Sequence, residues 1–547
     1  NNEENSTQQA PTMAPNSEST MQQISYISSG YGRSSTLSLS TGSSRDGRDE
    51  MSSAASENDL VFVTSYTDFD KLAHGPRGTE GKHSVHVYRF HPSDGSMCLL
   101  NIEGEAHDVI NPAFSRFHPR LNVVYTCTED IEKNGQIFAY SIGPDGELTK
   151  IGQVDAGGTS TCYITIAKDC RHLLAVNYWD STLAVFPISP ETGEFTGPRT
   201  SMYDPKEGQA VVAAAKKNGG VNHSNNDEST IQMRQKDPHS HALVLDPYFG
   251  VMAYVPCLGK DLIREFYYDK ENGVIASELN VLPSGLCSGR PDGPRYFVFH
   301  PSNDIAYVVN ELSSTVAVFR VDRALLREIA LAHKAGESME RFKGRSTLTL
   351  IQSISTIPKA FPTKMNTCGR ICVHKSGRFV IVSNRGHESI AIFRVKNKGS
   401  NRGELSTVGY FHTRGETPRH YQFDSSGQYL IVANQDSNSI AVFNFNLCSG
   451  EIKFTGNDYR VPSPNFVQCC PIHGDDEHQN TSILANATSV LGNQPILEEV
   501  IPSEIVTESD AETIKSTIPT NQSPGLTKKE LEMELEAARR QIDELKA

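Results

Sequence analysis

The sequence predicts an all-β fold, a seven-bladed β-propeller, from three observations. A strand signature rich in apolar and β-branched residues returns seven times between residues 58 and 472. Most copies follow two shorter apolar runs and precede a Gly-containing turn that often leads to a fourth run, which is typical of four-stranded antiparallel units. Four strands that repeat at roughly 50 residues indicate a propeller, in which radial packing protects the sheet edges. The seven copies are HSVHVYRF at 83, GQIFAYSI at 135, STLAVFPI at 181, DLIREFYY at 261, STVAVFRV at 314, ESIAIFRV at 388 and NSIAVFNF at 438.

The ring is expected to close by sharing one blade between the two ends of the propeller. The segments expected to form this shared blade are LVFVTSYT at 60 and EIKFTGND at 451. A large β-sandwich, or two smaller β domains, would also contain many short strands. Neither of these folds requires a repeat of fixed period, so the repeat favours the propeller.

Inserts and flanking segments account for the remaining chain. Two copies are spaced more widely, and we expect the polar insert near 203–238 and the amphipathic, helical insert near 324–345 to be surface excursions. Residues 1–57 are rich in Ser, Thr, Asn and Gln with little apolar periodicity, which predicts a disordered tail. Residues 473–525 are again polar and weakly periodic, and we interpret them as a linker.

Residues 526–547 predict a short amphipathic helix. Thr527 and Glu530 have capping-box spacing, and apolar residues then follow at alternating spacings of four and three. Such an a/d seam is typical of helices that pair, so we expect self-association or docking to a partner. An unpaired, solvated helix is the alternative, because the seam is short for a coiled coil. The seam consists of Leu531, Leu535, Ala538, Ile542 and Leu545.

Composition restricts the class of partner. The formal charge is -14 without a basic cluster, which argues against nucleic acid or an anionic membrane and favours a small metabolite or a protein. No apolar run approaches the length of a membrane span, and no signal-peptide core is present. Eleven cysteines without a CxxC pair indicate neither a disulfide framework nor a zinc site, so a reducing, cytoplasmic location is expected.

Two sequence positions in each blade are expected to meet at one mouth of the central channel. The chain reverses between the inner strand and the second strand, so the start of one lies beside the end of the other. The first position lies near the start of the inner strand and is occupied by Cys162, His241, Arg295 and Arg419. The second position follows the end of the second strand and is occupied by Glu129, Tyr178, Glu311, Arg385 and Gln435.

The charged residues at these positions vary from blade to blade, whereas the residue before the second position is Asn in four of the five blades. The same amide returns there as Asn177, Asn310, Asn384 and Asn434, which indicates a structural role in the turn. Solvated channel charges or ion pairs between blades would explain any single charged residue. An acid, an imidazole and several guanidinium groups that converge on one concave mouth favour a site for an anionic small molecule.

The blades also resemble a known family. GPRYFVFHPSNDIAYVVNELSSTVAVF, SNRGHESIAIF, TPRHYQFDSSGQYLIVANQDSNSIAVF and HSHALVLDP are similar to the lactonase family of seven-bladed propellers, which includes bacterial-type 6-phosphogluconolactonases and fungal carboxymuconate-lactonizing enzymes. For the muconate enzymes the resemblance implies a channel site of one His, one Glu and two Arg. By motif position these are His241, Arg295, Glu311 and Arg385.

The chain departs from the family pattern at two positions. PCLGKD, with Cys257, stands where the family usually has Asp-Leu-Gly, and Arg370 replaces an expected acid in CGRICV. Both departures would alter the charge around the site. They put the family's usual substrate in question.

The resemblance and the site residues together predict hydrolysis of a sugar-acid lactone, with 6-phosphogluconolactone of the pentose phosphate pathway as the best candidate. Glu311 is assigned as the base that activates water and His241 as a proton shuttle, an order that could be reversed. Of Arg295 and Arg385, one would stabilise the oxyanion and the other would bind the substrate phosphate. Further substrate contacts are expected from His239, Arg419, Glu129 and Gln435.

Two other functions remain open from the sequence. A cycloisomerase that closes or opens a muconate-type lactone would use the same acid, imidazole and arginines, and a non-catalytic binding or scaffold propeller would suit the long tails. His239 and His241 are an incomplete metal-ligand set, so no metal is expected. No Gly-rich phosphate loop or Ser-His-Asp order stands out, so no cofactor is expected.

Overall fold

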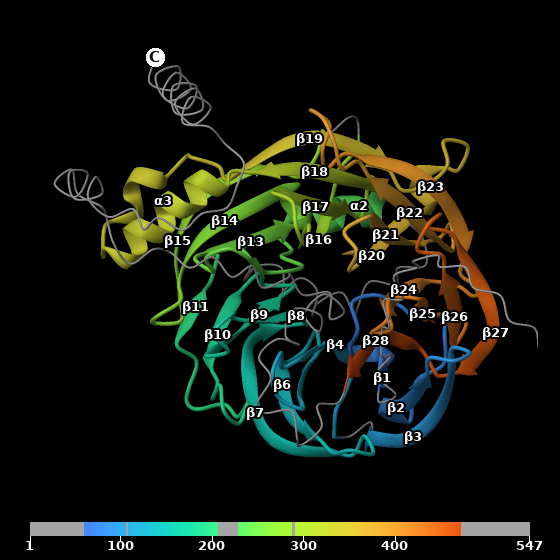
Figure 1. The fold of residues 1–547 in the computed structure, drawn as a ribbon. Coiled ribbons are helices and arrows are strands. Elements are labelled where there is room, and N and C mark those ends of the chain that lie inside the picture. Colours follow the sequence, from blue (N-terminus) through green and yellow to red (C-terminus); the bar gives the residue numbers. More distant parts are fainter. Residues whose placement is uncertain (1–58, 106–107, 206–227, 287–289, 472–547) are drawn as a thin grey trace, which may run out of the picture. The chain divides into compact units, whose positions relative to one another are not determined.

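A computed structural model describes four stretches of the chain, residues 59–105, 108–205, 228–286 and 290–471. These residues form seven four-stranded antiparallel sheets, which Figure 1 shows arranged around a central axis. The predicted seven-bladed β-propeller is therefore confirmed. The tail, linker and helix predicted for residues 1–57, 473–525 and 526–547 lie outside the described residues.

Each blade places its strands in sequence order from the axis to the rim, with one exception at the point of closure. The first blade combines β28 (Pro464–Pro471) with β1 (Asp59–Ser65), β2 (His83–His91) and β3 (Ser96–Glu105). The second contains β4 (Pro112–Phe117), β5 (Val123–Thr128), β6 (Asn134–Ile142) and β7 (Leu148–Thr159). The third contains β8 (Thr161–Ile166), β9 (His172–Asn177), β10 (Leu183–Pro187) and β11 (Ser201–Tyr203).

The remaining four blades follow the same plan. The fourth contains β12 (Val244–Leu245), β13 (Met252–Cys257), β14 (Leu262–Asp269) and β15 (Val274–Pro283). The fifth contains β16 (Pro294–Phe299), β17 (Ile305–Asn310), β18 (Thr315–Val321) and β19 (Leu348–Ser355). The sixth contains β20 (Thr367–Val373), β21 (Phe379–Arg385), β22 (Ser389–Val395) and β23 (Leu405–His412), and the seventh β24 (Pro418–Phe423), β25 (Tyr429–Asn434), β26 (Ser439–Phe445) and β27 (Ile452–Arg460).

The hydrophobic core lies between neighbouring blades. The second strands are buried along all or nearly all of their length, as in β17, because both faces of each such strand pack against another blade. These strands consequently carry nearly continuous apolar runs instead of alternating ones. The outer strands are exposed on one face, and β27 shows the resulting alternation of buried and exposed residues.

The ring closes differently from the sequence-based expectation. β1 is indeed in the shared blade, but its partner is β28, with Leu60 opposite Cys470 and Val63 opposite Val467. The expected partner, EIKFTGND at 451, forms β27, the outer strand of the seventh blade. That expectation was wrong because the strand that closes the ring becomes an inner strand and must be buried. β28 meets this requirement, since seven of its eight residues are buried.

The two inserts contain α2 (Glu228–Lys236) and α3 (Arg323–Lys334). α3 is the expected amphipathic helix at the rim beside β14 and β15 (Figure 1), where Tyr267 and His333 share a hydrogen bond of 2.7 Å. α2 does not behave as a simple surface excursion. Ile231 of this helix packs against Leu258 and Leu312, close to the channel mouth.

Four short 3₁₀ turns complete the described elements. They are η1 (Phe69–Lys71), η2 (Leu258–Lys260), η3 (Met339–Phe342) and η4 (Thr363–Met365). Among the described residues, no helix has the length and apolar character needed to cross a bilayer.

The Asn at or next to the end of the second strand in the third, fifth, sixth and seventh blades holds each of these blades to the one before it. Its side-chain amide donates to a backbone carbonyl in, or immediately after, the outer strand of the previous blade. In the seventh blade, for example, Asn434 Nδ2 donates to Thr413 O at 3.0 Å. Asn177, Asn310 and Asn384 make the equivalent bonds to Ala156 O, Ser284 O and Thr356 O. This geometry explains why the same residue returns in four blades.

We predict that Asn434→Ala lowers the free energy of unfolding by about 1–3 kcal/mol, because the buried Thr413 carbonyl loses its donor. Urea unfolding followed by tryptophan or tyrosine fluorescence measures this change. Asn444→Ala, at an exposed position of β26, is the matched control and is expected to change stability by less than about 0.5 kcal/mol. Equal losses for the two variants would contradict the role assigned to the repeated Asn.

Candidate active site

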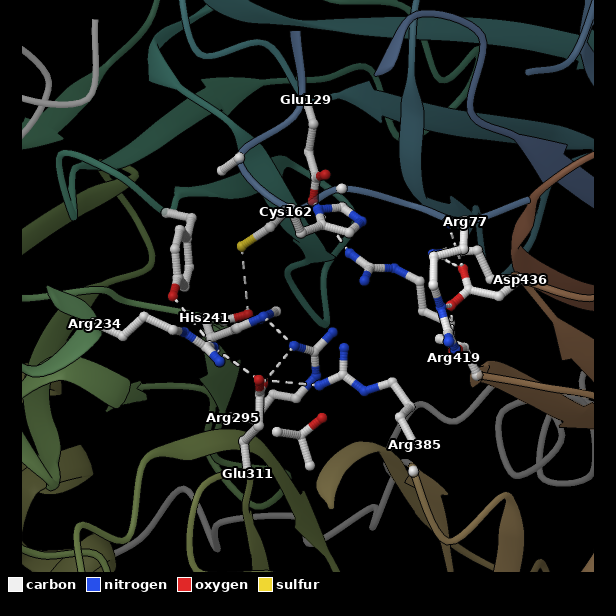
Figure 2. A pocket seen from close by; sticks show the side chains of 18 of the residues that line it. Arg77, Glu129, Cys162, Arg234, His241, Arg295, Glu311, Arg385, Arg419 and Asp436 are labelled. Carbon is white, nitrogen blue, oxygen red and sulfur yellow. Dashed lines mark hydrogen bonds and ion pairs between the residues drawn. The ribbon is translucent and has the colours of Figure 1, made fainter. Parts of the chain in front are cut away.

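A cavity of about 760 Å³ opens at one mouth of the channel, and the two predicted sequence positions meet there. Every residue assigned to those positions lines the cavity, and Figure 2 labels all of them except Tyr178 and Gln435. The residues are Glu129, Cys162, Tyr178, His241, Arg295, Glu311, Arg385, Arg419 and Gln435. The structure thus brings together the side chains that the strand topology predicted to converge.

β-Bulges direct three of the four first-position residues, Cys162, Arg295 and Arg419, toward the cavity. The register of β16 against β17 shifts between Pro294 and Tyr296, and Arg295 is the extra residue. The same shift occurs around Cys162 and Arg419 in the third and seventh blades. Because a bulge adds one unpaired residue and bends the strand locally, it can redirect a side chain that would otherwise face a neighbouring blade.

Glu311 is the centre of the site. Its Oε2 accepts a hydrogen bond from Arg295 Nη1 at 2.8 Å, and its Oε1 lies 2.7 Å from Arg234 Nη2 and 3.0 Å from Arg385 Nη2. Arg234 and Arg385 approach the carboxylate from opposite sides (Figure 2). The side chain of Glu311 is only 2% exposed, so its negative charge depends on these three guanidinium groups.

The electrostatic balance at Glu311 favours the carboxylate and leaves positive charge in excess. Burial would raise the pKa of Glu311, but Arg234, Arg385 and Arg295 hold it well below its usual value. Its ionised form therefore stabilises the fold above the ordinary pKa of a free Glu, and this contribution is lost as the pH falls through the lowered folded-state pKa. Three guanidinium charges against one carboxylate leave two positive charges uncompensated within this cluster. Burial lowers the pKa of Arg385 to about 10 despite the attraction of Glu311.

His241 contacts the same cluster through Arg295. Arg295 Nη1 donates to His241 Nε2 at 2.5 Å, and His241 Nδ1 is buried without a partner among the described residues. Burial and the nearby Arg295 lower the pKa of His241 well below 6.5, so the ring is neutral at physiological pH. The ring is held edge-on against Tyr178 and Tyr296, with centroids 5.2 and 5.4 Å away.

A second acid and arginine line another part of the cavity. Arg419 Nη2 lies 3.9 Å from Glu129 Oε1, and its guanidinium lies over the ring of Tyr66 at 5.3 Å. The Tyr66 hydroxyl donates to Glu129 Oε2 at 3.0 Å. Gln435 donates through Nε2 to Asp436 Oδ1 at 3.0 Å. These contacts place Glu129, Arg419 and Gln435 where the sequence predicted substrate-binding residues.

His239 does not belong to the cavity wall, contrary to its predicted role in substrate binding. Its ring is fully buried and stacks on Tyr178, with centroids 4.7 Å apart and an interplanar angle of 10°. Burial lowers its pKa to about 3, so it acts as a neutral packing group beneath Tyr178. Within the described stretches, no group of three or more His, Cys, Asp and Glu side chains could hold a metal ion.

The two departures from the family pattern lie away from the cavity lining. Cys257 is buried at the end of β13, and burial raises the pKa of its thiol. Arg370 lies on β20, where its Nη2 donates to Gln422 Oε1 at 2.9 Å and its Nη1 contacts His420 Nε2. Neither residue lines the 760 Å³ cavity.

Five charged residues of the cavity lining were not predicted from the sequence: Arg77, Arg234, Lys364, Glu388 and Asp436. Arg234 comes from the polar insert, which has no counterpart in other blades. Its charge therefore could not be compared with residues at equivalent positions, that is, in the same column of the aligned blades. Glu388, in contrast, begins the third strand signature of the sixth blade and adopts a left-handed φ of 51°. The same column contains Ser181, Ser314 and Asn438 with φ of 57°, 54° and 54°. Asp261 occupies the same column with a φ of 56°, so a comparison of this column would have singled out two acids, Asp261 and Glu388, of which Glu388 lines the cavity.

Fold and site together define a class of protein, a propeller with an acid and several arginines at its channel mouth. A family model described as "Lactonase, 7-bladed beta-propeller" matches residues 60–469. The chain belongs to this family. The family resemblance noted from the sequence is confirmed, and membership supports a lactone hydrolase.

Named relatives and solved structures agree with this assignment. The chain is 29% identical over 362 residues to the 6-phosphogluconolactonase of Bacillus subtilis, covering 65% of this chain and 87% of that protein. It is 26% identical over 371 residues to the 6-phosphogluconolactonase of Formosa agariphila, covering 67% and 86%. Among solved structures, the periplasmic gluconolactonase of Pseudomonas aeruginosa matches with a TM-score of 0.57 and 23% identity, covering 75% of this chain and 98% of that one. This structural match supports the fold.

The raised pKa of Glu388 predicts that anion binding depends on pH. Burial raises its pKa to about 7, with Asp436 and Glu416 adding repulsion, so its carboxyl group is neutral below about pH 7 and negative above it. Because Glu388 lines the cavity, sulfate should bind more weakly at pH 8 than at pH 6, by about threefold to tenfold. Calorimetric titration with sulfate, which stays a dianion across this range, measures the change.

The matched variant is Glu388→Gln, for which the sulfate affinity should be nearly the same at both pH values. A wild-type protein whose sulfate affinity is constant between pH 6 and pH 8 would contradict the expected ionisation. An equal pH dependence in both proteins would assign the effect to another group.

Proposed function

We propose that the protein hydrolyses the lactone of a phosphorylated sugar acid, with 6-phosphogluconolactone as substrate and 6-phosphogluconate as product. The observation that carries this proposal is the cluster of Glu311 with Arg234, Arg295 and Arg385 on the cavity wall. The names of the two bacterial relatives support the same substrate. The reaction would then belong to the pentose phosphate pathway.

The charge and size of the cavity suit such a substrate. The cluster has two uncompensated positive charges, and an anionic ligand would neutralise them. Guanidinium groups bind phosphate through paired N–H donors, which gives orientation as well as attraction. A volume of about 760 Å³ falls within the range that small-molecule sites usually occupy.

Glu311 is the base in the proposed mechanism. A water molecule attacks the lactone carbonyl carbon while its proton passes to the Glu311 carboxylate, and the C=O electron pair moves onto the carbonyl oxygen. When this tetrahedral intermediate collapses, the bond to the ring oxygen breaks and that oxygen takes a proton, returning Glu311 to its carboxylate form. The product is the open-chain hydroxy acid, whose new carboxyl group releases its proton to solvent.

The arginines stabilise the negative charge both before and after this proton transfer. In the resting site they stabilise the Glu311 carboxylate, which makes it a weak base. As Glu311 takes the proton, the negative charge moves to the substrate oxyanion, and the same guanidinium groups remain nearby to stabilise it. Arg295 is assigned to the oxyanion and Arg385 to the substrate phosphate.

His241 is assigned to relay the proton toward the ring oxygen. Its neutral ring and its unpartnered Nδ1 suit a relay. It is a poorer choice for the initial base, because a second positive charge would then lie against Arg295, which already donates to Nε2. The order in which Glu311 acts first is therefore preferred to the reverse order.

We predict that Glu311→Gln lowers kcat for 6-phosphogluconolactone by at least about 100-fold, because the amide cannot accept the proton. Glu311→Asp retains the charge and should keep more of the rate and of the thermal stability. The matched control is Glu132→Gln at an exposed position, for which kcat should be unchanged. The assay follows acid release after the spontaneous hydrolysis of the lactone has been subtracted.

Equal rates for the wild type and Glu311→Gln, with circular dichroism confirming that both are folded, would remove Glu311 from the mechanism. Turnover of a muconate-type lactone without turnover of 6-phosphogluconolactone would contradict the proposed substrate. Absence of any lactone turnover by the wild type would favour a non-catalytic binding propeller.

A further inference from the structure

Helix α2 lies outside the blade repeat, yet it is anchored at the channel mouth. Ile231 is only 8% exposed and packs against Leu258 and Leu312, which belong to the fourth and fifth blades. Gln235 Nε2 donates to Leu258 O at 2.6 Å and lies 3.2 Å from Asp261 Oδ1. Apolar packing and hydrogen bonds therefore fix the helix against the propeller.

A glycine permits the close approach of the chain that follows α2. A Cβ atom placed on Gly259 would lie only 1.8 Å from the carbonyl oxygen of Asp237. No other residue type would leave room for this backbone contact. The η2 turn of the fourth blade is thus shaped to receive the C-terminal end of α2.

The docked helix delivers Arg234 to the Glu311 carboxylate. Its Nη2 lies 2.7 Å from Glu311 Oε1 and within 3.5 Å of the Tyr178 hydroxyl. The side chain is 18% exposed and lines the cavity, so a ligand in the cavity can contact it. Arg385 reaches the same carboxylate oxygen from the opposite side (Figure 2).

Arg234 gives the site more positive charge than Glu311 requires. Arg295 alone would balance the carboxylate, whereas Arg234 and Arg385 leave two charges for a ligand. A phosphate monoester has a charge of about −1.5 to −2 at pH 7 and offers three acceptor oxygens. Two guanidinium groups on either side of one carboxylate oxygen are close enough to share such a group.

We propose that Arg234 is a specificity-determining residue, which binds the phosphate of the substrate together with Arg385. The insert helix then sets the preference for a phosphorylated over an unphosphorylated sugar-acid lactone. This inference rests on the proposed function. It adds that the preference comes from an insert between blades and not from the repeated blade positions.

Comparison of two lactones tests the role of Arg234. For Arg234→Gln, the ratio of kcat/KM for 6-phosphogluconolactone to kcat/KM for unphosphorylated glucono-1,5-lactone should fall about 10- to 100-fold, because a charge-assisted bond to the phosphate is lost. Any effect of the substitution through its contact with Glu311 is common to both lactones and leaves this ratio unchanged. Arg234→Lys retains the charge without the planar fork and should give an intermediate ratio. The matched control is Arg327→Gln on the exposed face of α3, which should leave both lactones unaffected.

Equal losses for both lactones, or no change for either, would overturn the inference. Calorimetric binding of 6-phosphogluconate and gluconate separates this inference from the proposed reaction. Tighter binding of the phosphorylated acid by the wild type, lost in Arg234→Gln, would support the role of Arg234 even if neither lactone were hydrolysed. Equal affinities of the wild type and Arg234→Gln for 6-phosphogluconate, or no binding by either, would contradict it.

Discussion

The buried carboxylate of Glu311, surrounded by three guanidinium groups, is the interaction on which the site depends. A carboxylate with 2% of its side chain exposed would be costly without partners, and removing one partner of a buried ion pair usually destabilises a protein by about 3–5 kcal/mol. The three arginines come from β16, β21 and α2, so the ion cluster also ties together the fifth blade, the sixth blade and the insert. One set of contacts therefore combines a structural role with the charge that an anionic ligand needs.

The propeller supplies this geometry through features that recur in several blades. Bulges near the start of the inner strands turn Arg295 and Arg419 into the channel, and the repeated Asn fixes the connection that precedes each such strand. Packing between blades makes this framework rigid, since the second strands are buried on both faces. Residues after the Asn, such as Glu311, are then free to differ between blades without disturbing the core.

The repeat made most of this arrangement predictable from the sequence. Its seven copies gave the number of blades, and reversal of the chain between strands placed Glu311, His241 and Arg385 at one mouth. Features without a repeated counterpart were not predictable in this way. The closing strand β28 lacks the signature of the third strands, and Arg234 lies in an insert whose docking depends on tertiary contacts of Ile231. His239 was misplaced because strand periodicity does not reveal that Tyr178 covers its ring.

A crystal structure of the protein with bound 6-phosphogluconate would test the central claim most directly. We expect the phosphate to lie within hydrogen-bond distance of Arg234 and Arg385, with the carboxyl carbon of the product beside Glu311 and Arg295. A product bound elsewhere on the propeller, or bound in the cavity with its carboxyl group out of reach of Glu311, would contradict the account.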